Sequence, residues 1–266
     1  MIEDIELKDK EFDLFQKFIF KEIGISLDNS KKILVKNRLS KQLTKYALNS
    51  YSDYYRLIQI NSEEKTKMLN LITTNETYFF RENKHFTFIE EEFAPKYQNK
   101  KIRIWSAASS IGAEAYSIAM LLDDLELDYE IIASDINTEV IKKANIGLYP
   151  IKMMEKIPQR LKLKYCLKGK RAHEGWFLVD RCLIEKIKFE KRNLLEKQLD
   201  LGKFDIIFLR NVLIYFNMDM KEKILMNIIK NLKVGSFLIL SLTEHLYDVE
   251  KYKLKKIHNS IFQKVE

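Results

Sequence analysis

Apolar residues recur at three- and four-residue spacing through the first 70 residues, a pattern typical of amphipathic helices. A first helix is predicted by the apolar positions Phe12, Phe15, Phe18, Ile19 and Ile23. Gly24 supplies a stop signal for it. A second helix, with capping residues at 26–30, is predicted by the stripe Leu34, Val35, Leu39, Leu43 and Tyr46. With further short helices at 51–60 and 65–73, residues 1–73 are expected to form a small helical domain.

The period changes from residue 101 onwards. Short apolar runs at 102–106, 129–134, 204–209 and 236–240 are typical of buried strands. Helical stretches at 113–122, 138–145 and 218–232 lie between them. This alternation predicts an α/β fold, a doubly wound Rossmann-like parallel sheet over 101–266. Residues 74–100 are expected to form a linker or lid helix between the two domains.

Residues 150–192 interrupt the alternation of strands and helices. Within them, the pieces 175–179 and 184–189 are expected to pair as a small antiparallel β insert. The last residues, 254–265, are expected to form a closing hairpin.

The composition is that of a soluble globular protein, with 46% hydrophobic and 32% charged residues. No apolar run is long enough to span a bilayer, and the start Met1-Ile2-Glu3-Asp4 lacks the apolar core of a signal peptide. The two cysteines, Cys166 and Cys182, have no metal-type spacing. We therefore expect a cytoplasmic, reduced, metal-free protein that is a monomer.

Positive charge is concentrated in two places. Residues 150–192 contain 13 Lys/Arg and 5 Asp/Glu, so this segment accounts for the whole formal net charge of +8. A second cluster includes Lys31, Arg38, Lys41 and Lys45, whose spacing puts them on one face of the second predicted helix. Such patches attract nucleic acid, anionic membranes or acidic protein surfaces. The alternative for any single lysine is an ordinary solvated face.

Candidate ligand-binding residues follow the predicted strands, and in doubly wound folds ligands bind at that edge. The turn 107–112 consists of small residues with a single glycine, so it lacks the dinucleotide fingerprint G-x-G-x-x-G. Asp135 ends the second strand, where an acid typically accepts hydrogen bonds from a ribose. Asn193, Arg210 and Asn211 follow later strands. The pattern favours a nucleoside cofactor without a pyrophosphate, with S-adenosylmethionine as the leading candidate. The alternative for Asp135 is an ordinary helix cap.

The segment 75–82 is unusual for a linker, because it combines three aromatics with an amide, a hydroxyl and a guanidinium. A polar, aromatic-rich stretch before the first strand suggests a lid over a ligand site. The alternative is an amphipathic helix end whose aromatics dock on the sheet.

Four motifs, in order, resemble the chemotaxis receptor glutamate O-methyltransferases, the CheR family, and the resemblance covers nearly the whole chain. They are Asn75-Glu76-Thr77-Tyr78-Phe79-Phe80-Arg81-Glu82, Trp105-Ser106-Ala107-Ala108-Ser109-Ser110-Ile111-Gly112-Ala113-Glu114-Ala115-Tyr116-Ser117, Ala133-Ser134-Asp135-Ile136-Asn137 and Phe208-Leu209-Arg210-Asn211-Val212-Leu213-Ile214-Tyr215-Phe216.

The resemblance implies an S-adenosylmethionine-dependent enzyme that methylates glutamate side chains on chemoreceptors. It implies a cofactor site lined by Asn75, Thr77, Arg81, Glu114, Asp135, Asn193, Leu194, Arg210 and Asn211. The basic helix with Lys31, Arg38, Lys41 and Lys45 would face the acidic methylation region of the receptor. In some relatives the β insert docks a receptor tail, and the sequence leaves open whether this insert does so.

The chain departs from the family pattern at two places. Ala113 and Ala115 stand where the family usually has Glu and Pro, while Glu114, expected to contact the cofactor, is retained. Near the C-terminus a usual Gly-His-Ser-Glu-Ser reads as Ser241-Leu242-Thr243-Glu244-His245, a loop to which the sequence assigns no role.

The reaction needs no general base, because a glutamate with an ordinary pKa near 4.3 is already ionised at neutral pH. The enzyme must align the reacting atoms and remove water from the carboxylate. Arg81 and Tyr215 are the candidate catalytic residues, holding substrate or cofactor by directional hydrogen bonds. The alternatives are a structural ion pair for Arg81 and a core position for Tyr215.

Two other functions are weighed. The basic patches suggest a nucleic-acid methyltransferase, but the sequence 211–215 lacks the Pro-Pro-aromatic element of adenine amino-methylating enzymes. The second alternative is an adaptor that binds the receptor without catalysis. The retained Arg81, Asp135 and Tyr215 argue against it. We therefore expect no nucleic-acid partner and no insertion into the membrane.

Overall fold

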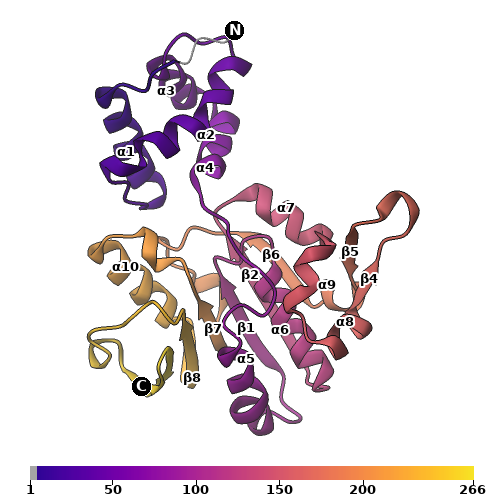
Figure 1. Cartoon of the computed structure of the whole chain (residues 1–266). Helices are drawn as coiled ribbons and strands as arrows, with labels where there is room; N and C mark the ends of the chain where they lie inside the picture. Colours follow the sequence, from indigo (N-terminus) through magenta and orange to yellow (C-terminus); the bar gives the residue numbers. More distant parts are fainter. Residues whose placement is uncertain (1–4) are drawn as a thin grey trace. The chain divides into compact units, whose positions relative to one another are not determined.

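The computed structural model describes residues 5–266, which form two compact units (Figure 1). One unit contains the chain up to Thr74 together with residues 215–221, and the other contains residues 75–214 and 222–266.

The first unit is built from helices around an aromatic core. Its helices are α1 (Asp9–Ile23), α2 (Lys32–Lys45), α3 (Tyr51–Ile60) and α4 (Ser62–Ile72), with a 3-10 turn at Asn29–Lys31. Gly24 ends α1 in a left-handed conformation with φ of 73°, and the side chains of Ser50 and Asn61 cap α3 and α4. Phe15 is fully buried against Tyr51 and Tyr54. The predicted helices are therefore confirmed.

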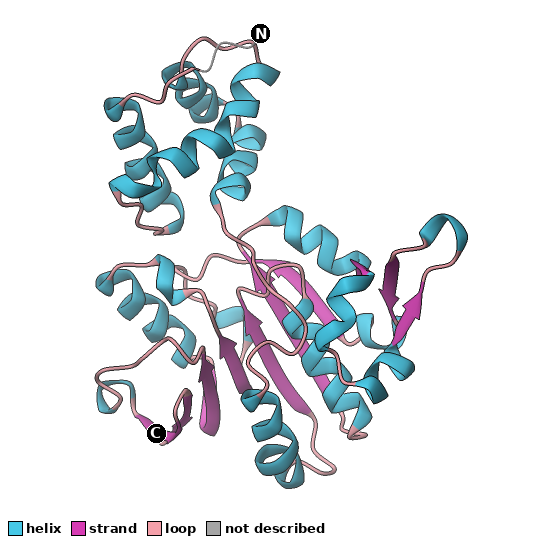
Figure 2. Cartoon of the chain, in the orientation of Figure 1, coloured by secondary structure: helices cyan, strands magenta, loops and turns pink. Residues whose placement is uncertain are grey.

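The second unit is organised by a seven-stranded, mostly parallel sheet (Figure 2). In spatial order its strands are β6 (Ile187–Lys191), β2 (Tyr129–Asp135), β1 (Ile102–Ala107), β7 (Phe204–Leu209), β8 (Leu232–Leu240), β10 (Ile261–Lys264) and β9 (Leu254–His258). The first five run parallel. The predicted closing hairpin is formed by β9 and β10, and β10 pairs antiparallel with β8. The predicted α/β fold is confirmed.

The strand register sets where the site lies. Ala107, the last residue of β1, pairs with Ser134 of β2 and with Leu209 of β7, and Leu209 pairs with Leu240 of β8. The carboxyl ends of these four neighbouring strands therefore lie together, and the loops that follow them share one edge of the sheet.

The remaining helices connect the strands. They are α5 (Lys84–Phe88), α6 (Ala113–Asp124), α7 (Thr138–Ile146), α8 (Gln159–Tyr165), α9 (Arg181–Ile184) and α10 (Met218–Ile229). The helix predicted to run to residue 232 ends at Ile229, because Leu232 already pairs with Phe204 in the sheet. Of the predicted linker or lid helix, residues 74–83 are not helical, and α5 continues as a π-helix at Ile89–Phe93 and a 3-10 turn at Ala94–Lys96.

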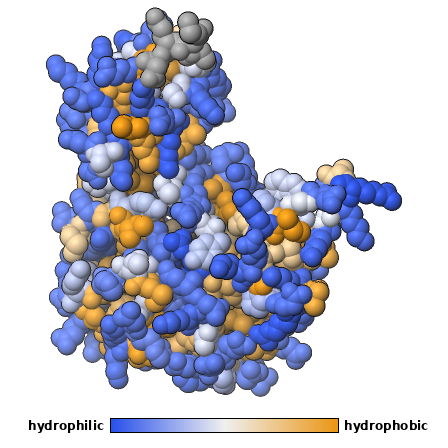
Figure 3. All heavy atoms as spheres, in the orientation of Figure 1, coloured by the Kyte–Doolittle hydropathy of each residue, from blue (hydrophilic) through white to orange (hydrophobic). Residues whose placement is uncertain are grey.

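The small β insert exists, but its predicted pairing is wrong. It is a three-stranded antiparallel sheet of β3 (Leu148–Pro150), β5 (Trp176–Val179) and β4 (Cys166–Lys168). The piece 184–189 does not pair with β5. Its residues from Ile187 onwards belong to β6, which extends the main sheet parallel to β2. The β4–β5 connection projects as a largely hydrophilic arm (Figure 3).

No helix within residues 5–266 combines the length and apolar character needed to cross a membrane.

Candidate active site

The turn after β1 has the small residues that the sequence shows, and its backbone is unusual. Ala108, Ser110 and Gly112 have positive φ values of 66°, 51° and 86°. The turn is joined to β2, because Ser109 N donates to the Ser134 carbonyl at 2.8 Å. A side chain at Gly112 would come within 2.9 Å of the Cβ of Ala144, so only glycine lets α6 begin this close to α7.

Asp135 lies where the sequence placed it, at the end of β2, and it is buried. Its Oδ2 accepts a hydrogen bond from Ser110 N and its Oδ1 accepts one from Asn137 N, both at 2.9 Å. Burial raises the pKa of Asp135, and these N–H groups offset part of that rise. Each carboxylate oxygen has a second lone pair, so the group has capacity to accept hydrogen bonds from a vicinal diol.

The segment 75–82 is neither a helix nor a free linker. Its start is tied to the β1 turn, because Ser110 Oγ donates to the Asn75 carbonyl at 2.9 Å. Its aromatics Phe79 and Phe80 are core residues, and Phe80 N donates to Ser117 Oγ on α6 at 2.9 Å. The alternative of a helix end is therefore wrong in conformation, although it correctly placed these two aromatics in the core. Whether the segment acts as a lid stays a prediction.

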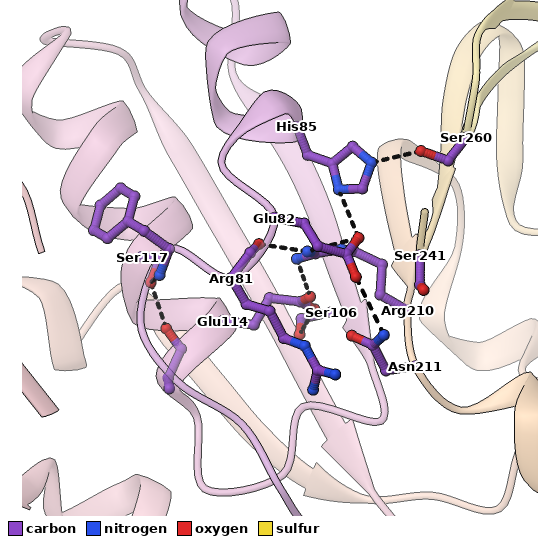
Figure 4. A network of polar contacts seen from close by, with 12 residues as sticks. Arg81, Glu82, His85, Ser106, Glu114, Ser117, Arg210, Asn211, Ser241 and Ser260 are labelled. Carbon is purple, nitrogen blue, oxygen red and sulfur yellow. Dashed lines mark hydrogen bonds and ion pairs between the residues drawn. The ribbon is translucent and has the colours of Figure 1, made fainter. Parts of the chain in front are cut away.

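Arg210 is the centre of a buried polar network that joins this segment to the sheet (Figure 4). Its side chain, 1% exposed, forms ion pairs with Glu114 at 2.9 Å and with Glu82 at 3.3 Å. It also donates to the Arg81 carbonyl. Glu114 accepts a second hydrogen bond, of 2.7 Å, from Ser106 Oγ on β1. Arg210 was predicted to line the cofactor site. Its guanidinium instead binds neighbouring protein groups and holds Glu114 and the Arg81 backbone in place.

Glu82 accepts hydrogen bonds from two other loops. Its Oε1 accepts from Asn211 Nδ2 at 3.2 Å, and its Oε2 accepts from Leu242 N at 3.0 Å. Burial raises the pKa of Glu82, but the charge of Arg210 and these donors outweigh burial and hold it below its usual value. Glu82 is therefore ionised at neutral pH and joins the 75–82 segment to the loops after β7 and β8.

His85 extends the network to the C-terminal hairpin (Figure 4). Its Nε2 lies 2.6 Å from Ser260 Oγ, and its Nδ1 lies 3.6 Å from Glu82 Oε2. Burial, together with the charge of Arg210, lowers the pKa of His85 to about 4. The ring is therefore neutral at pH 7 and is no candidate for a cationic catalyst.

Strained backbone is concentrated at this edge of the sheet. Ten non-glycine residues within 5–266 have positive φ, and five of them lie in the loops described above: Phe80, Glu82, Ala108, Ser110 and Asn211. Such conformations are unfavourable for side chains and persist where surrounding contacts fix them. The buried network supplies those contacts.

The other predicted site residues differ in how firmly the protein holds them. Arg81 is partly exposed, and its guanidinium donates to the Glu76 carbonyl at 3.0 Å beside the Tyr78 ring. Asn193 follows β6 and orders its loop, because its Oδ1 accepts from Leu195 N at 3.1 Å. Leu194 is buried, and Thr77 is partly buried in the 75–82 segment.

Tyr215 ends the 3-10 turn Leu213–Tyr215 and groups with the first unit, so its catalytic role stays a prediction.

The basic helix α2 contains one residue whose contacts the sequence did not anticipate. The guanidinium of Arg38 donates to the Ile72 and Thr73 carbonyls and to Thr74 Oγ, so it caps the end of α4. Lys31 lies in the turn before α2, Lys41 is exposed, and Lys45 donates to Tyr46 Oη at 2.7 Å. Arg38 therefore has an internal role, and Lys41 is the better representative of the exposed basic face.

Sequence reasoning missed Glu82, His85 and Glu244 as site residues. Glu82 is the last residue of the first motif, and Glu244 is retained in the altered C-terminal motif. Their places in these motifs could have marked them, but their residue types and spacing alone indicated no role. Within residues 5–266 no group of three or more His, Cys, Asp or Glu side chains could hold a metal ion.

Comparisons with known proteins agree with this geometry. The family model described as CheR methyltransferase, all-alpha domain, matches residues 10–73, and that described as CheR methyltransferase, SAM binding domain, matches residues 75–261. A chemotaxis protein methyltransferase of Salmonella typhimurium is 35% identical over 264 residues, covering 96% of this chain and 91% of the relative. Those of Escherichia coli and Borreliella burgdorferi are 36% and 32% identical, covering 94% and 91% of this chain and 90% of each relative.

Proposed function

Because this chain belongs to the CheR methyltransferase family, we propose that it methylates glutamate side chains of chemoreceptors. The products would be glutamate methyl esters and S-adenosylhomocysteine. The observation that carries the proposal is the site at the carboxyl edge of the sheet. There Asp135, at the end of β2, accepts a hydrogen bond from the β1 turn, and Arg210 binds both Glu114, in the first turn of α6, and the Arg81 backbone, all within an S-adenosylmethionine-binding domain.

The residues present fit a cationic nucleoside cofactor. Ser109 Oγ is buried in the β1 turn without a hydrogen-bond partner among residues 5–266, so it can serve a ligand. Asp135 has acceptor capacity for a ribose, and Glu114 offers negative charge to an ammonium group. When bound, S-adenosylmethionine supplies a methyl group made electrophilic by its sulfonium.

The tasks left to the protein are binding, orientation and exclusion of water. No proton has to be removed, since the attacking glutamate is already ionised. Arg81 is suited to hold a carboxylate, because its guanidinium donates to the Glu76 carbonyl and keeps a planar set of further donors. Tyr215 is the second candidate for orienting the substrate. Charge is neutralised in the reaction, so directional hydrogen bonds are more useful here than a strong ionic clamp.

The alternatives are less well supported. The family and its relatives favour neither a nucleic-acid methyltransferase nor a silent adaptor. We propose that the enzyme acts as a monomer in the cytoplasm on the acidic helical region of a receptor, with the basic face of α2 as the docking surface. The β insert, with exposed basic residues in its β4–β5 connection, is a second candidate contact for a receptor tail.

Reversing the charge at Lys41 tests the docking surface. Lys41→Glu is expected to raise the apparent KM for receptor by roughly three- to tenfold at low salt, because an exposed charge steers association. The effect should fade as salt shortens the screening length to about 8 Å. Steady-state kinetics at two salt concentrations measure this. An unchanged receptor KM at low salt would mean that the face is only solvated.

Arg38 serves as the contrast to Lys41. Arg38→Ala is expected to lower the free energy of unfolding by about 1–3 kcal/mol, because the carbonyls at the end of α4 lose a charged donor. A kinetic defect in an Arg38 variant is therefore no measure of docking unless its stability is measured as well.

Removing the acid at the end of β2 tests the cofactor site. Asp135→Ala is expected to weaken binding of S-adenosylhomocysteine by about 1–3 kcal/mol, because charge-assisted hydrogen bonds to the ribose are lost. Calorimetry with one site per chain measures this. Asp128→Ala, an exposed aspartate just before β2, is the matched control and should leave affinity unchanged. If the parent protein bound neither S-adenosylmethionine nor S-adenosylhomocysteine, the proposal that it is a methyltransferase would be refuted.

A further inference from the structure

Glu244, in the loop after β8, is a buried acid that the proposed chemistry does not use. Its Oε1 accepts hydrogen bonds from Val212 N at 3.0 Å and Leu213 N at 2.8 Å. Its Oε2 accepts from Asn211 N at 3.0 Å and from Ser241 N at 3.1 Å. One carboxylate thus satisfies four backbone donors, three of them consecutive in the turn after β7.

The turn 211–213, which Glu244 holds, has an unfavourable backbone conformation. Asn211 has a φ of 56°, and Leu213 is buried. Three neighbouring N–H groups that point the same way have no mutual partners, so they need a common acceptor. Only an ionised carboxylate offers two oxygens with enough lone pairs for all of them.

A second carboxylate holds the same turn from another loop. Glu82 accepts from the Asn211 side chain and from Leu242 N, beside Glu244 in the β8 loop. Because Glu82 directly follows Arg81, the two acids tie the Arg81 segment, the turn 211–213 and the loop 241–244 together. Figure 4 shows the contact of Glu82 with Asn211.

We propose that Glu244 is a positioning residue for methyl transfer, acting through the turn 211–213. This inference rests on the proposed function, since the turn begins with the candidate cofactor residue Asn211. Glu244 contacts neither substrate nor cofactor in this role. It sets the backbone from which the Asn211 side chain extends toward Glu82.

The chemistry predicts an unusual response to substitution. Glu244→Gln keeps the size of the side chain, but its amide NH₂ would face N–H donors in place of an acceptor. The isosteric Gln variant should therefore be about as defective as Glu244→Ala. If Glu244 only filled space, Gln would restore function.

The experiment compares the kcat of each variant with that of the parent enzyme at a temperature where both are folded. Each kcat is divided by the number of S-adenosylhomocysteine-binding sites that calorimetry counts. Glu244→Gln and Glu244→Ala are both expected to lower kcat by roughly 100-fold, as for a small displacement of reacting groups, with receptor KM nearly unchanged. Glu250→Gln, an exposed acid in the same region, and Leu254→Ala, a buried truncation in β9, are the controls. Both should keep kcat within about twofold, although Leu254→Ala lowers the melting temperature.

Amide exchange in the unmodified enzyme tests the same claim without a variant. The amides of Val212 and Leu213 should exchange roughly 100-fold or more slowly than that of exposed Tyr247, although both groups lie in loops. Fast exchange at 212 and 213, or a Gln variant with kcat within twofold of the parent, would overturn the proposal. If Glu244→Gln does not fold, the amide measurement decides. A parent enzyme without methyl transfer would refute the proposed function instead.

Discussion

Replacing Arg210 by leucine is expected to lower the free energy of unfolding by about 3–5 kcal/mol and to abolish methyl transfer. The substitution leaves the partly buried Glu82 and Glu114 without their shared, fully buried cation, and removing one partner of a buried ion pair has a cost of this size. It also removes the donor to the Arg81 carbonyl. Chemical denaturation, with product formation measured in parallel, gives both quantities.

The pH dependence of that loss follows from the carboxylates. In the parent protein the pKa of Glu82 is held low, so its contribution to stability is present above the unfolded pKa and is lost as the pH falls through the folded pKa. In Arg210→Leu that contribution is absent, and protonated carboxyls are buried at less cost. The difference in stability between variant and parent should therefore shrink as the pH falls.

An exposed arginine provides the matched control for Arg210. Arg181→Leu on α9 removes the same charge from the surface and should change stability by no more than about 0.5 kcal/mol. A loss below 1 kcal/mol in Arg210→Leu would mean that the network does not depend on its central cation.

Replacing Arg81 by alanine is expected to lower turnover by roughly 100- to 1000-fold, the effect of deleting one donor that orients the reacting groups. The free energy of unfolding should fall by only about 1 kcal/mol or less, because Arg81 is partly exposed and its guanidinium contacts only the Glu76 carbonyl and the Tyr78 ring within residues 5–266. Single-turnover methyl transfer and chemical denaturation separate these two effects.

Two further variants make the Arg81 prediction specific. Arg81→Lys keeps the charge but loses the planar fork, so it should recover only a small part of the activity. Lys84→Ala removes an exposed cation nearby and should be indistinguishable from the parent. An Arg81→Ala enzyme that unfolds early, or that turns over normally, would show that Arg81 is structural or incidental.

Local patterns in the sequence sufficed for most of the helices and strands. The stripe that ends at Ile23 specifies its helix, because burial of one face imposes a period of 3.6. The runs that end at Ala107 and Asp135 specify strands, because central parallel strands are buried on both faces and read as continuous apolar runs. The piece 184–189 was assigned to the wrong sheet. Its apolar residues indicate a strand, but they do not say whether its partner is β5 nearby or β2, about 50 residues earlier in the chain.

Site residues could be predicted where they follow the end of a strand. They could not be predicted where their partners are backbone groups. Asp135 lies at the predicted strand end, where acids typically accept hydrogen bonds from a ribose, and that role for it stays a prediction. Glu82 and Glu244 were not predicted, because their partners include N–H groups that every residue type offers, at separations of up to 160 residues. The contacts of Arg38 were not anticipated for a related reason. Its place on a helix face is set by spacing, but its long side chain reaches carbonyls 34 and 35 residues away.

The most direct test of the central claim is the chemical identity of the bond that the enzyme forms. The protein is incubated with receptor-containing membranes and S-adenosylmethionine labelled in its methyl group, and the washed product is treated with alkali. Methylation of glutamate predicts that the label leaves as volatile methanol, since among the products considered only a carboxyl ester is so labile. Label that enters the membranes but stays non-volatile after alkali, or label found only on nucleic acid, would contradict the account.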